Sequence, residues 1–527
     1  MKNKYLLCGL LCALTFTACK KEISDNINVT PIPGGKSPDT YKPIEVSELP
    51  KLKNLRINGA TCGYDMLNKL YYFPVSSGTS LNSYTVNFDS TAAAAVIIDG
   101  QRVLSGGTVK FPLTANNNIT VRVINSFNTP EDYNLFITNL PIVHLGVSDK
   151  IEDEYVHAYF ELIDPDYAAH QGKLSVRSDI NIRLRGVTAR NLPKKSYAVH
   201  ITDAGGNDKD ASLLGLRNDN NWILDAMYID EARMRNRLCT DIWNSFNNVP
   251  YKAQEPEALN GTRGYMVEVF YNNFYNGVYC LTEKLDRKQL KIKKQYGDMY
   301  KADDVTDQSN FLDVIPYDNL SKMWGGWELE YPDLGDTPSP EWGYLYDEIN
   351  FVAKSTDAEF LADIENKVDI DNMVDYFIFM NVIYATDNNA KNLFFSFYDK
   401  RTAPAFFYSP WDLDGSMGRN WAGLKVNNII IGAGTNNLLK RLVNLNAGNF
   451  ISRVKKRWGE LKINQLSAGA VAGRIEGYKK VLLAAGAFDR EIKFTYGIDK
   501  NLITEAGYMN SWYAAQLDAF DTYVNKL

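Results

Sequence analysis

One order of elements in the last third of the chain constrains its fold more than any other feature. Apolar side chains within residues 370–386 recur at the spacing of a helix, namely at Val374, Phe377, Ile378 and Val382. The expected helix leads into a polar loop that begins at Asp387 and contains Asn392. Two aromatic-rich runs within residues 393–409 then predict a β-hairpin, and Asp412 follows it directly.

This order allows two carboxylates far apart in the sequence to share one site, because a hairpin returns the chain to the loop where it began. Phosphoryl transfer needs one carboxylate to orient the acceptor hydroxyl, and further oxygen ligands to hold Mg²⁺ against nucleotide phosphates. Protein kinases have the same order of helix, Asp-x-x-x-x-Asn, hairpin and Asp. Ala385-Thr386 replaces the His-Arg pair that precedes the catalytic Asp of ordinary kinases. Since Asp-x-x-x-x-Asn alone is a common helix-end turn, the full order carries the argument.

The segment upstream is compatible with the amino-terminal lobe of a kinase. Residues 182–186 predict a strand, and a basic stretch leads into a second alternating run at 197–201. A helix is expected over 234–246 with Asp230 as its N-cap, and residues 265–283 predict a hairpin. No Gly-x-Gly-x-x-Gly loop is present to cover phosphates, so the pattern does not predict an ordinary eukaryotic-type kinase.

Several separated motifs, taken in order, resemble one family. From about residue 145 to 525 the chain is similar to the spore-coat-protein-H (CotH) kinase family, including an acidic-aromatic insert at 327–332. The motifs are Arg185-Gly186, Pro193-Lys194-Lys195-Ser196-Tyr197, Trp222-Ile223-Leu224, Met234-Arg235-Asn236-Arg237-Leu238, Gly277-Val278-Tyr279-Cys280-Leu281-Thr282-Glu283 and Pro410-Trp411-Asp412-Leu413-Asp414.

The resemblance implies an α+β fold with an atypical bilobal protein-kinase-like domain. It also implies transfer of the ATP γ-phosphoryl group, with Mg²⁺ or Mn²⁺, to Ser or Thr of an exported protein. The chain departs from the family at residues 187–190, where a polar stretch usually follows Arg-Gly. The residues expected to act are Asp387 as catalytic base, Asp412 and Asn392 at the metal, Arg185 with Lys194 or Lys195 at the phosphates, and Glu283 near the nucleotide hinge. Asp414 is either a second metal ligand or a turn residue, and the turn is favoured.

The amino terminus indicates export. Lys2 and Lys4 precede an apolar run, Tyr5 to Thr17, that is too short to span a bilayer and is typical of a signal peptide. The end of that run, Phe16-Thr17-Ala18-Cys19, resembles the lipobox of bacterial lipoproteins. We therefore expect residues 1–18 to be removed and Cys19 to carry a lipid that anchors the protein in the cell envelope, facing the periplasm or the cell surface. Ordinary cleavage near Ala18, with Cys19 incidental, is the alternative.

Three further segments are expected after the signal peptide. Residues 19–50 contain five prolines and predict a semi-extended tether. Residues 51–140 alternate at period two between turn residues, which is typical of a small β-sandwich of the cadherin or immunoglobulin kind serving as a spacer or adhesive module. Residues 141–527 are expected to form the kinase-like domain, with a helical carboxyl-terminal part.

Composition excludes several other kinds of protein. The net charge of −6 gives no electrostatic basis for binding nucleic acid. All four histidines lie between His144 and His200, which excludes a His-rich zinc site or a Ser-His-Asp triad elsewhere in the chain. Three cysteines remain beyond Cys19 and allow at most one disulfide, with Cys239 and Cys280 as one pair to consider.

Two functions of other classes remain open from the sequence. One is an inactive kinase-like fold that serves as a surface adhesion or scaffold module, since an exported protein meets little ATP. The other is a glycan-binding surface protein. Its support is a run of aromatic side chains that also fits a partly buried insert: Trp324, Trp327, Tyr331 and Trp342.

Overall fold

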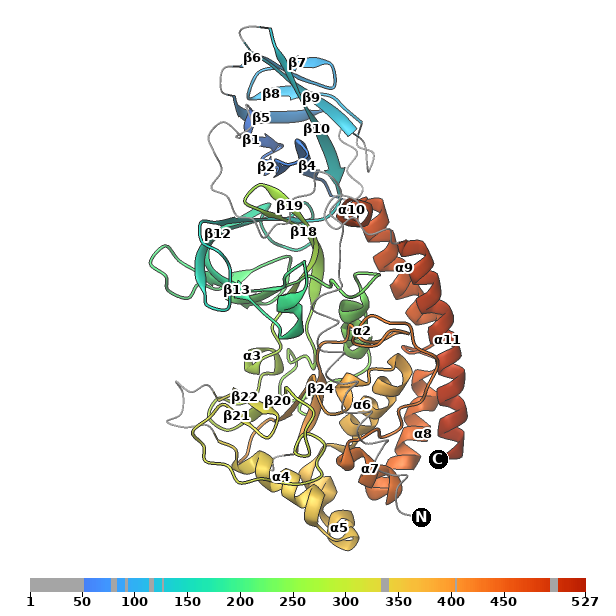
Figure 1. The fold of residues 1–527 in the computed structure, drawn as a ribbon. Coiled ribbons are helices and arrows are strands. Elements are labelled where there is room, and N and C mark those ends of the chain that lie inside the picture. Colours follow the sequence, from blue (N-terminus) through green and yellow to red (C-terminus); the bar gives the residue numbers. More distant parts are fainter. Residues whose placement is uncertain are drawn as a thin grey trace, which may run out of the picture.

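A computed structural model describes residues 52–76, 83–90, 93–112, 118–125, 128–332, 341–402, 405–492 and 501–527. The expected signal peptide, the lipidation site Cys19 and the tether lie outside these residues. The fold mixes helices and strands: an all-β unit at one end adjoins a closed barrel, and a largely helical part follows (Figure 1). Within the described residues, no helix combines the length and apolar character that a bilayer span requires.

The N-terminal β unit, residues 52–138, consists of two sheets that share one buried core. Strand alternation explains the core, since Tyr84, Val86 and Phe88 are buried while Thr85 and Asn87 between them are exposed. The first sheet contains β2 (Ala60–Thr61), β1 (Leu52–Ile57), β5 (Tyr84–Ser90) and β8 (Gly107–Val109). The second contains β3 (Gly63–Asp65), β4 (Leu70–Pro74), β10 (Pro130–Thr138), β9 (Asn118–Asn125), β6 (Ala93–Ile98) and β7 (Gln101–Val103).

A seven-stranded closed barrel follows. Two of its strands, β11 (Ile142–Val147) and β18 (Gly264–Tyr271), pair in parallel and close the barrel, with Ile142 opposite Glu268. All other neighbouring strands in the barrel pair antiparallel. At the turn of the predicted hairpin, Asn272 and Asn273 both adopt positive φ, a conformation that asparagine tolerates well. The strands in order round the barrel are β11 (Ile142–Val147), β12 (Val156–Ile163), β13 (Ser175–Leu184), β14 (Tyr197–Thr202), β17 (Asn221–Asp225), β19 (Phe274–Glu283) and β18 (Gly264–Tyr271).

Below the barrel in Figure 1 lies the part of the chain that contains β20 to β24 and α4 to α7, which we call the lower part. It is built round α6 (Ile370–Ile383), in which every residue except Asp371 is buried. A five-stranded antiparallel sheet packs beside it, in the order β21 (Met323–Trp324), β22 (Trp327–Tyr331), β20 (Asp298–Ala302), β23 (Leu393–Phe397) and β24 (Phe407–Pro410). The sequence prediction of a helix at 370–386 and a hairpin after it is confirmed. The remaining short elements are β15 (Ala211–Ser212), β16 (Asn218–Asp219), η2 (Thr188–Asn191), η3 (Asp387–Asn389) and η4 (Ala447–Asn449).

The carboxyl-terminal helices contact all three parts, namely the N-terminal β unit, the barrel and the lower part. In Figure 1, α9 and α11 run along one side of the molecule, and α10 lies where the barrel meets the N-terminal β unit. The expected helix beginning near Met234 is present, but Met234 and not Asp230 occupies the N-cap position. The carboxylate of Asp230 instead accepts hydrogen bonds from the backbone amides of Met234 and Arg235. The helices are α2 (Arg235–Asn244), α3 (Arg287–Leu290), α4 (Gly343–Lys354), α5 (Asp357–Lys367), α7 (Asn437–Asn444), α8 (Phe450–Leu461), α9 (Ala468–Ala484), α10 (Ala487–Arg490) and α11 (Leu502–Lys526).

Candidate active site

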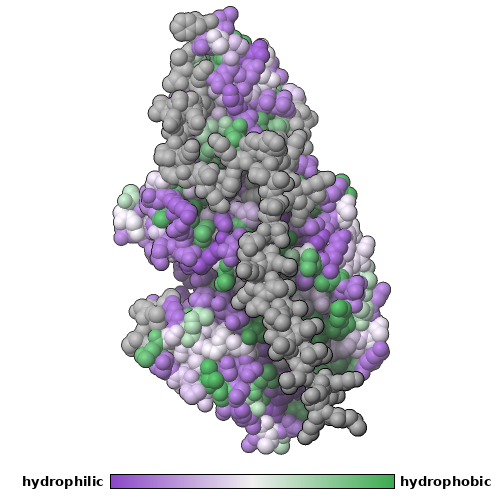
Figure 2. Space-filling view, in the orientation of Figure 1, coloured by the Kyte–Doolittle hydropathy of each residue, from purple (hydrophilic) through white to green (hydrophobic). Residues whose placement is uncertain are grey.

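A cleft of about 960 Å³ lies between the barrel and the lower part. One wall comes from the barrel and the loops at its lower edge, and the other from β20, β22, the loop after α6 and the loop after β24. Figure 2 shows the surface hollowed between the barrel and the part below it. The volume is at the upper end of the range for small-molecule sites and is large enough for a nucleotide.

Asp387 lines the cleft because of how α6 ends. The helix stops where Tyr384 turns to the left-handed conformation, with φ 58°, and the chain continues into the short turn η3. The Asn388 side chain then donates hydrogen bonds of 2.6 Å to the carbonyls of both Asn392 and Trp411. These bonds join the Asp387 loop to the segment that carries Asp412.

The β23–β24 hairpin brings Asp412 back to this loop, as the sequence predicts. Leu393 pairs with Pro410, and the Trp411 amide donates a 3.0 Å hydrogen bond to the carbonyl of Asn392. Asn392 and Asp412 both have positive φ, of 52° and 56°. Non-glycine residues rarely hold this conformation, so the surrounding contacts fix both side chains where they line the cleft.

Several carboxylates line the cleft together, those of Asp225, Asp387, Asp412 and Asp414. Enclosure by the protein raises the pKa of Asp412, although its side chain is open to the cavity, and neighbouring Asp225 raises it further. The pKa of Asp387 is also raised, because burial outweighs the charge of Lys391. Burial and the charge of Asp412 together hold the pKa of Asp414 well above its ordinary value. Such mutual repulsion favours a bound cation.

The donor set fits a hard cation held partly by a nucleotide. No three His, Cys, Asp or Glu side chains among the described residues form a ready-made metal cage. Magnesium at nucleotide sites is commonly held by one or two carboxylates together with phosphate oxygens, so such a cage is not required. Asp412 and Asn392 supply a carboxylate and an amide oxygen to the same cleft, and Asp414 supplies a further carboxylate there.

Basic side chains also line the cleft, close to these carboxylates. The Arg185 guanidinium lies 5.5 Å from the centre of the Trp411 ring, and both Arg185 and Lys301 act electrostatically on Asp412. Lys391 lines the cleft beside Asp387. Lys301 already forms an ion pair with Asp303 at 2.7 Å, whereas Arg185 and Lys391 are placed to meet phosphate oxygens near the carboxylates.

Lys194 borders the cleft, but its ammonium is fully buried and held by the protein. It donates to the carbonyl of Val278, forms an ion pair of 3.0 Å with Glu491 and lies 4.4 Å from the Tyr279 ring centre. Burial lowers the pKa of Lys194 to about 8, against the opposing charge of Glu491. Lys194 therefore supports the cleft wall through contacts inside the protein, where its ammonium is bound by other groups of the chain.

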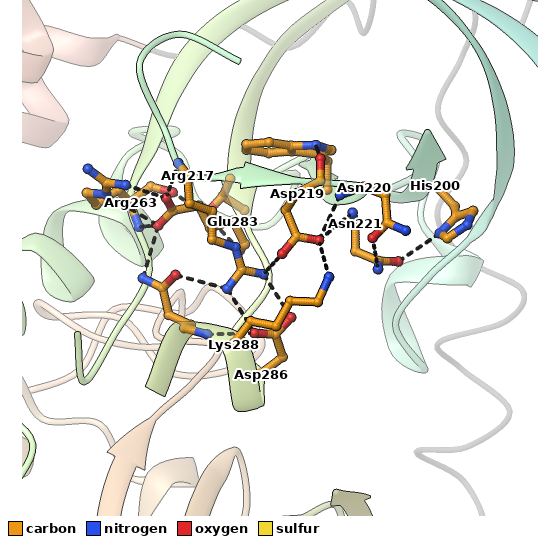
Figure 3. A network of polar contacts seen from close by, with 12 residues as sticks. His200, Arg217, Asp219, Asn220, Asn221, Arg263, Glu283, Asp286 and Lys288 are labelled. Carbon is orange, nitrogen blue, oxygen red and sulfur yellow. Dashed lines mark hydrogen bonds and ion pairs between the residues drawn. The ribbon is translucent and has the colours of Figure 1, made fainter. Parts of the chain in front are cut away.

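The structure does not bring Lys195 or Glu283 into the cleft. The Lys195 ammonium donates a 2.7 Å hydrogen bond to the carbonyl of Arg190. Figure 3 shows the fully buried Glu283 carboxylate in a polar network, where it accepts hydrogen bonds from the backbone amides of Arg217 and Arg263. The neighbouring Lys284, one residue on, does line the cleft.

Asp225, Lys301 and Lys391 line the cleft and were not predicted from the sequence as site residues. Asn236, on α2, links Asp225 to the Asp412 loop, since its amide donates 2.9 Å to the Asp225 carboxylate and its oxygen accepts from the Leu413 amide. Asp225 is the last residue of β17, the barrel strand that contains Trp222-Ile223-Leu224. Its position directly after that motif is the sequence signal that could have identified it. Lys301 stands on β20, where no sequence pattern marks it.

The side chains behind the glycan-binding alternative are buried. The exposed fractions of Trp324, Trp327, Tyr331 and Trp342 are 7%, 0%, 4% and 1%. They pack inside the lower part and present no aromatic surface, so the partly buried insert is the correct interpretation. The three described cysteines, Cys62, Cys239 and Cys280, are free and buried, and the pair considered from the sequence is not formed.

Comparison with protein families identifies this architecture. The model described as CotH kinase protein matches residues 182–519, a segment that contains most of the barrel, the cleft and the helices around it. No curated protein matches the chain. Because the match covers well over half of the sequence, the chain belongs to the CotH kinase family.

Proposed function

We propose that this protein is a metal-dependent phosphotransferase of the atypical bilobal kinase type, which transfers the γ-phosphoryl group of ATP to Ser or Thr of an exported protein. The observation that carries the proposal is the convergence of Asp387, Asn392 and Asp412 in one cleft that cationic side chains also line. Membership of the CotH kinase family supports the same chemistry.

Each side chain has a distinct part. Asp387 orients the acceptor hydroxyl and accepts its proton, while Asp412 and Asn392 would hold the divalent cation. That cation, when bound, neutralises charge on the phosphates. Arg185 and Lys391 stabilise the charge on the phosphoryl oxygens, and they do so in an enclosed cleft where such interactions are strong.

We further propose that the protein works at the cell envelope as a lipid-anchored enzyme. The support is the signal-peptide pattern and the lipobox-like sequence ending at Cys19. Residues 52–138, with two sheets round one core, are compatible with a cadherin-like or immunoglobulin-like sandwich. The acceptor would then be another protein that has crossed the same membrane.

The direct test is phosphoryl transfer. The full chain is incubated with labelled ATP and either Mg²⁺ or Mn²⁺, and label is followed into the chain itself and into a Ser-rich test protein. We expect transfer that a chelator abolishes and that Asp387→Ala and Asp412→Ala both lose. If the wild-type protein neither transfers label nor binds ATP with metal, the proposal fails and the inactive adhesion or scaffold function takes its place.

Arg185→Gln is expected to weaken ATP binding by about 10- to 100-fold, which corresponds to losing one charge-assisted hydrogen bond to phosphate. Lys195→Gln is the matched control, because the Lys195 ammonium bonds to a carbonyl and does not line the cleft. It should change affinity less than twofold. Titration calorimetry with a non-hydrolysable ATP analogue and Mg²⁺ measures both, and equal losses would contradict the assignment.

A further inference from the structure

Two adjacent residues at the end of α10 connect the N-terminal β unit to the wall of the cleft. Arg490 is 4% exposed and forms a 2.7 Å ion pair with Glu268 of the barrel. Its guanidinium also lies 5.2 Å from the Tyr72 ring centre and 5.9 Å from that of Phe136. Tyr72 and Phe136 belong to β4 and β10, so the N-terminal β unit provides one side of the pocket that holds Arg490.

The next residue, Glu491, is fully buried and faces the cleft wall. Its carboxylate pairs with Lys194 at 3.0 Å and with Arg233 at 2.6 Å, and it accepts a 2.8 Å hydrogen bond from the Val278 amide. Arg233 in turn donates to the carbonyl of Tyr228 at 2.8 Å. Lys194 and Tyr228 both line the cleft. Glu491 therefore connects the segments that contain Lys194 and Tyr228, which form part of the barrel side of the cleft, its upper wall.

Arg490 and Glu491 share one backbone segment, and the buried ion pairs of both side chains fix its position. One peptide bond joins them, and each makes buried ion pairs whose loss leaves an uncompensated charge. Packing leaves little slack, since a Cβ on Gly277 would stand 3.3 Å from both the Glu491 side chain and the Lys194 ammonium. A shift of Arg490 is thus passed on to Glu491 and to the cleft wall.

The N-terminal β unit is firmly docked at this point. The Tyr72 ring stacks on Tyr275 of the barrel hairpin, with centres 5.2 Å apart and planes 7° apart. The core of the unit continues into the barrel through Ile142, Ile163 and Phe270. This continuity differs from a spacer that only separates the catalytic part from its anchor.

We propose that the N-terminal β unit positions the upper wall of the cleft through Arg490 and Glu491, and so forms part of the structure on which nucleotide binding depends. Tyr72 and Phe136 act as positioning residues, although they lie outside the matched family segment 182–519. The positioning of the wall follows from the contacts alone. Only its consequence for ATP rests on the proposed function.

Acylation of Lys194 by an amine-reactive reagent tests the positioning without any assay of activity. Its ammonium is fully buried, so modification requires the wall to open. Rates for the full chain are followed by peptide mass spectrometry, with Lys195 in the same segment as internal reference.

Tyr72→Leu and the milder Phe136→Leu remove aromatic faces from Arg490, while Tyr72→Phe keeps the face and loses only a hydroxyl that has no hydrogen-bond partner among the described residues. Tyr133→Leu is the matched control in the same core, where the ring contacts Tyr64 and Tyr71.

We expect Tyr72→Leu to raise the Lys194 acylation rate by about tenfold, the effect of losing one desolvated cation–π contact. Phe136→Leu should raise it less, and Tyr72→Phe and Tyr133→Leu should stay within about twofold of wild type. An unchanged rate in Tyr72→Leu, or an equal rise in Tyr133→Leu, overturns the proposal. ATP-analogue affinity is measured on the same variants and should weaken in the same order. If acylation follows the expected order but the wild-type protein binds no ATP, the positioning stands and the proposed function fails.

Discussion

Replacing Asp387 with Asn is expected to lower kcat for phosphoryl transfer by about 10²- to 10⁴-fold while leaving ATP affinity within about threefold of wild type. Asparagine keeps the shape of the side chain but cannot accept the proton of the acceptor hydroxyl. The pKa of Asp387 is raised by its burial, which makes its carboxylate a stronger base than an exposed one. Single-turnover transfer and analogue binding, measured on the same preparation, separate the two effects.

Asp412→Asn should give the opposite pattern. Because Asp412 supplies the carboxylate for the cation, its loss should weaken ATP binding in the presence of metal and leave little difference between metal and chelator. Asp371→Asn serves as control, since Asp371 lies on the same helix that leads to Asp387 but its side chain is 80% exposed and pairs with Arg453 at the surface. Identical defects in Asp387→Asn and Asp412→Asn would contradict the separate roles.

The predictions that succeeded concern local order along the chain. Helical spacing before Asp387 and two aromatic runs after Asn392 determine the turn-back that places Asp412, and each signal lies within a short window. Because a hairpin must return to its start, the proximity of the two loops follows from sequence order alone. The Asn388 bridge between them was not predicted, since its partners are backbone carbonyls.

The parts that could not be predicted depend on pairings across long distances. Closure of the barrel needs Ile142 to meet Glu268, and no pattern within either strand specifies that partner. The same limit applies to the basic pair: Lys194 is buried because Glu491, almost 300 residues later, neutralises it, whereas Lys195 points elsewhere. Asp225 joins the cleft through Asn236 on α2, a contact that appears only after the barrel and the helix have packed.

Glu505 on α11 links the carboxyl-terminal helix to the active-site loop. Its carboxylate accepts hydrogen bonds from Arg235 and, at 2.6 and 2.7 Å, from Arg419. Arg235 also donates 3.1 Å to the carbonyl of Ser416, four residues after Asp412. Burial alone would raise the pKa of Glu505, but the hydrogen bond from Arg419 and the charge of Arg235 outweigh it and hold the pKa at about 2.

Glu505→Gln is therefore expected to lower the free energy of unfolding by about 3 kcal/mol at pH 7, because folding lowers the pKa of Glu505 from 4.5 to about 2. Arg235 and Arg419 would each lose one of two carboxylate partners and keep Asp230 and Glu231, respectively. Since the folded pKa lies below the ordinary value of 4.5, the carboxylate contributes fully above pH 4.5 and loses its contribution as the pH falls toward 2. The gap between wild type and variant should thus close over that interval, measured by denaturant unfolding at several pH values. Glu460→Gln is the control, because Glu460 is half exposed and pairs with Arg457 at 3.4 Å, and it should cost under about 0.5 kcal/mol. A gap that stays constant down to pH 2.5 would show that Glu505 acts by packing alone, and would remove the charge link between α11 and the loop that carries Asp412.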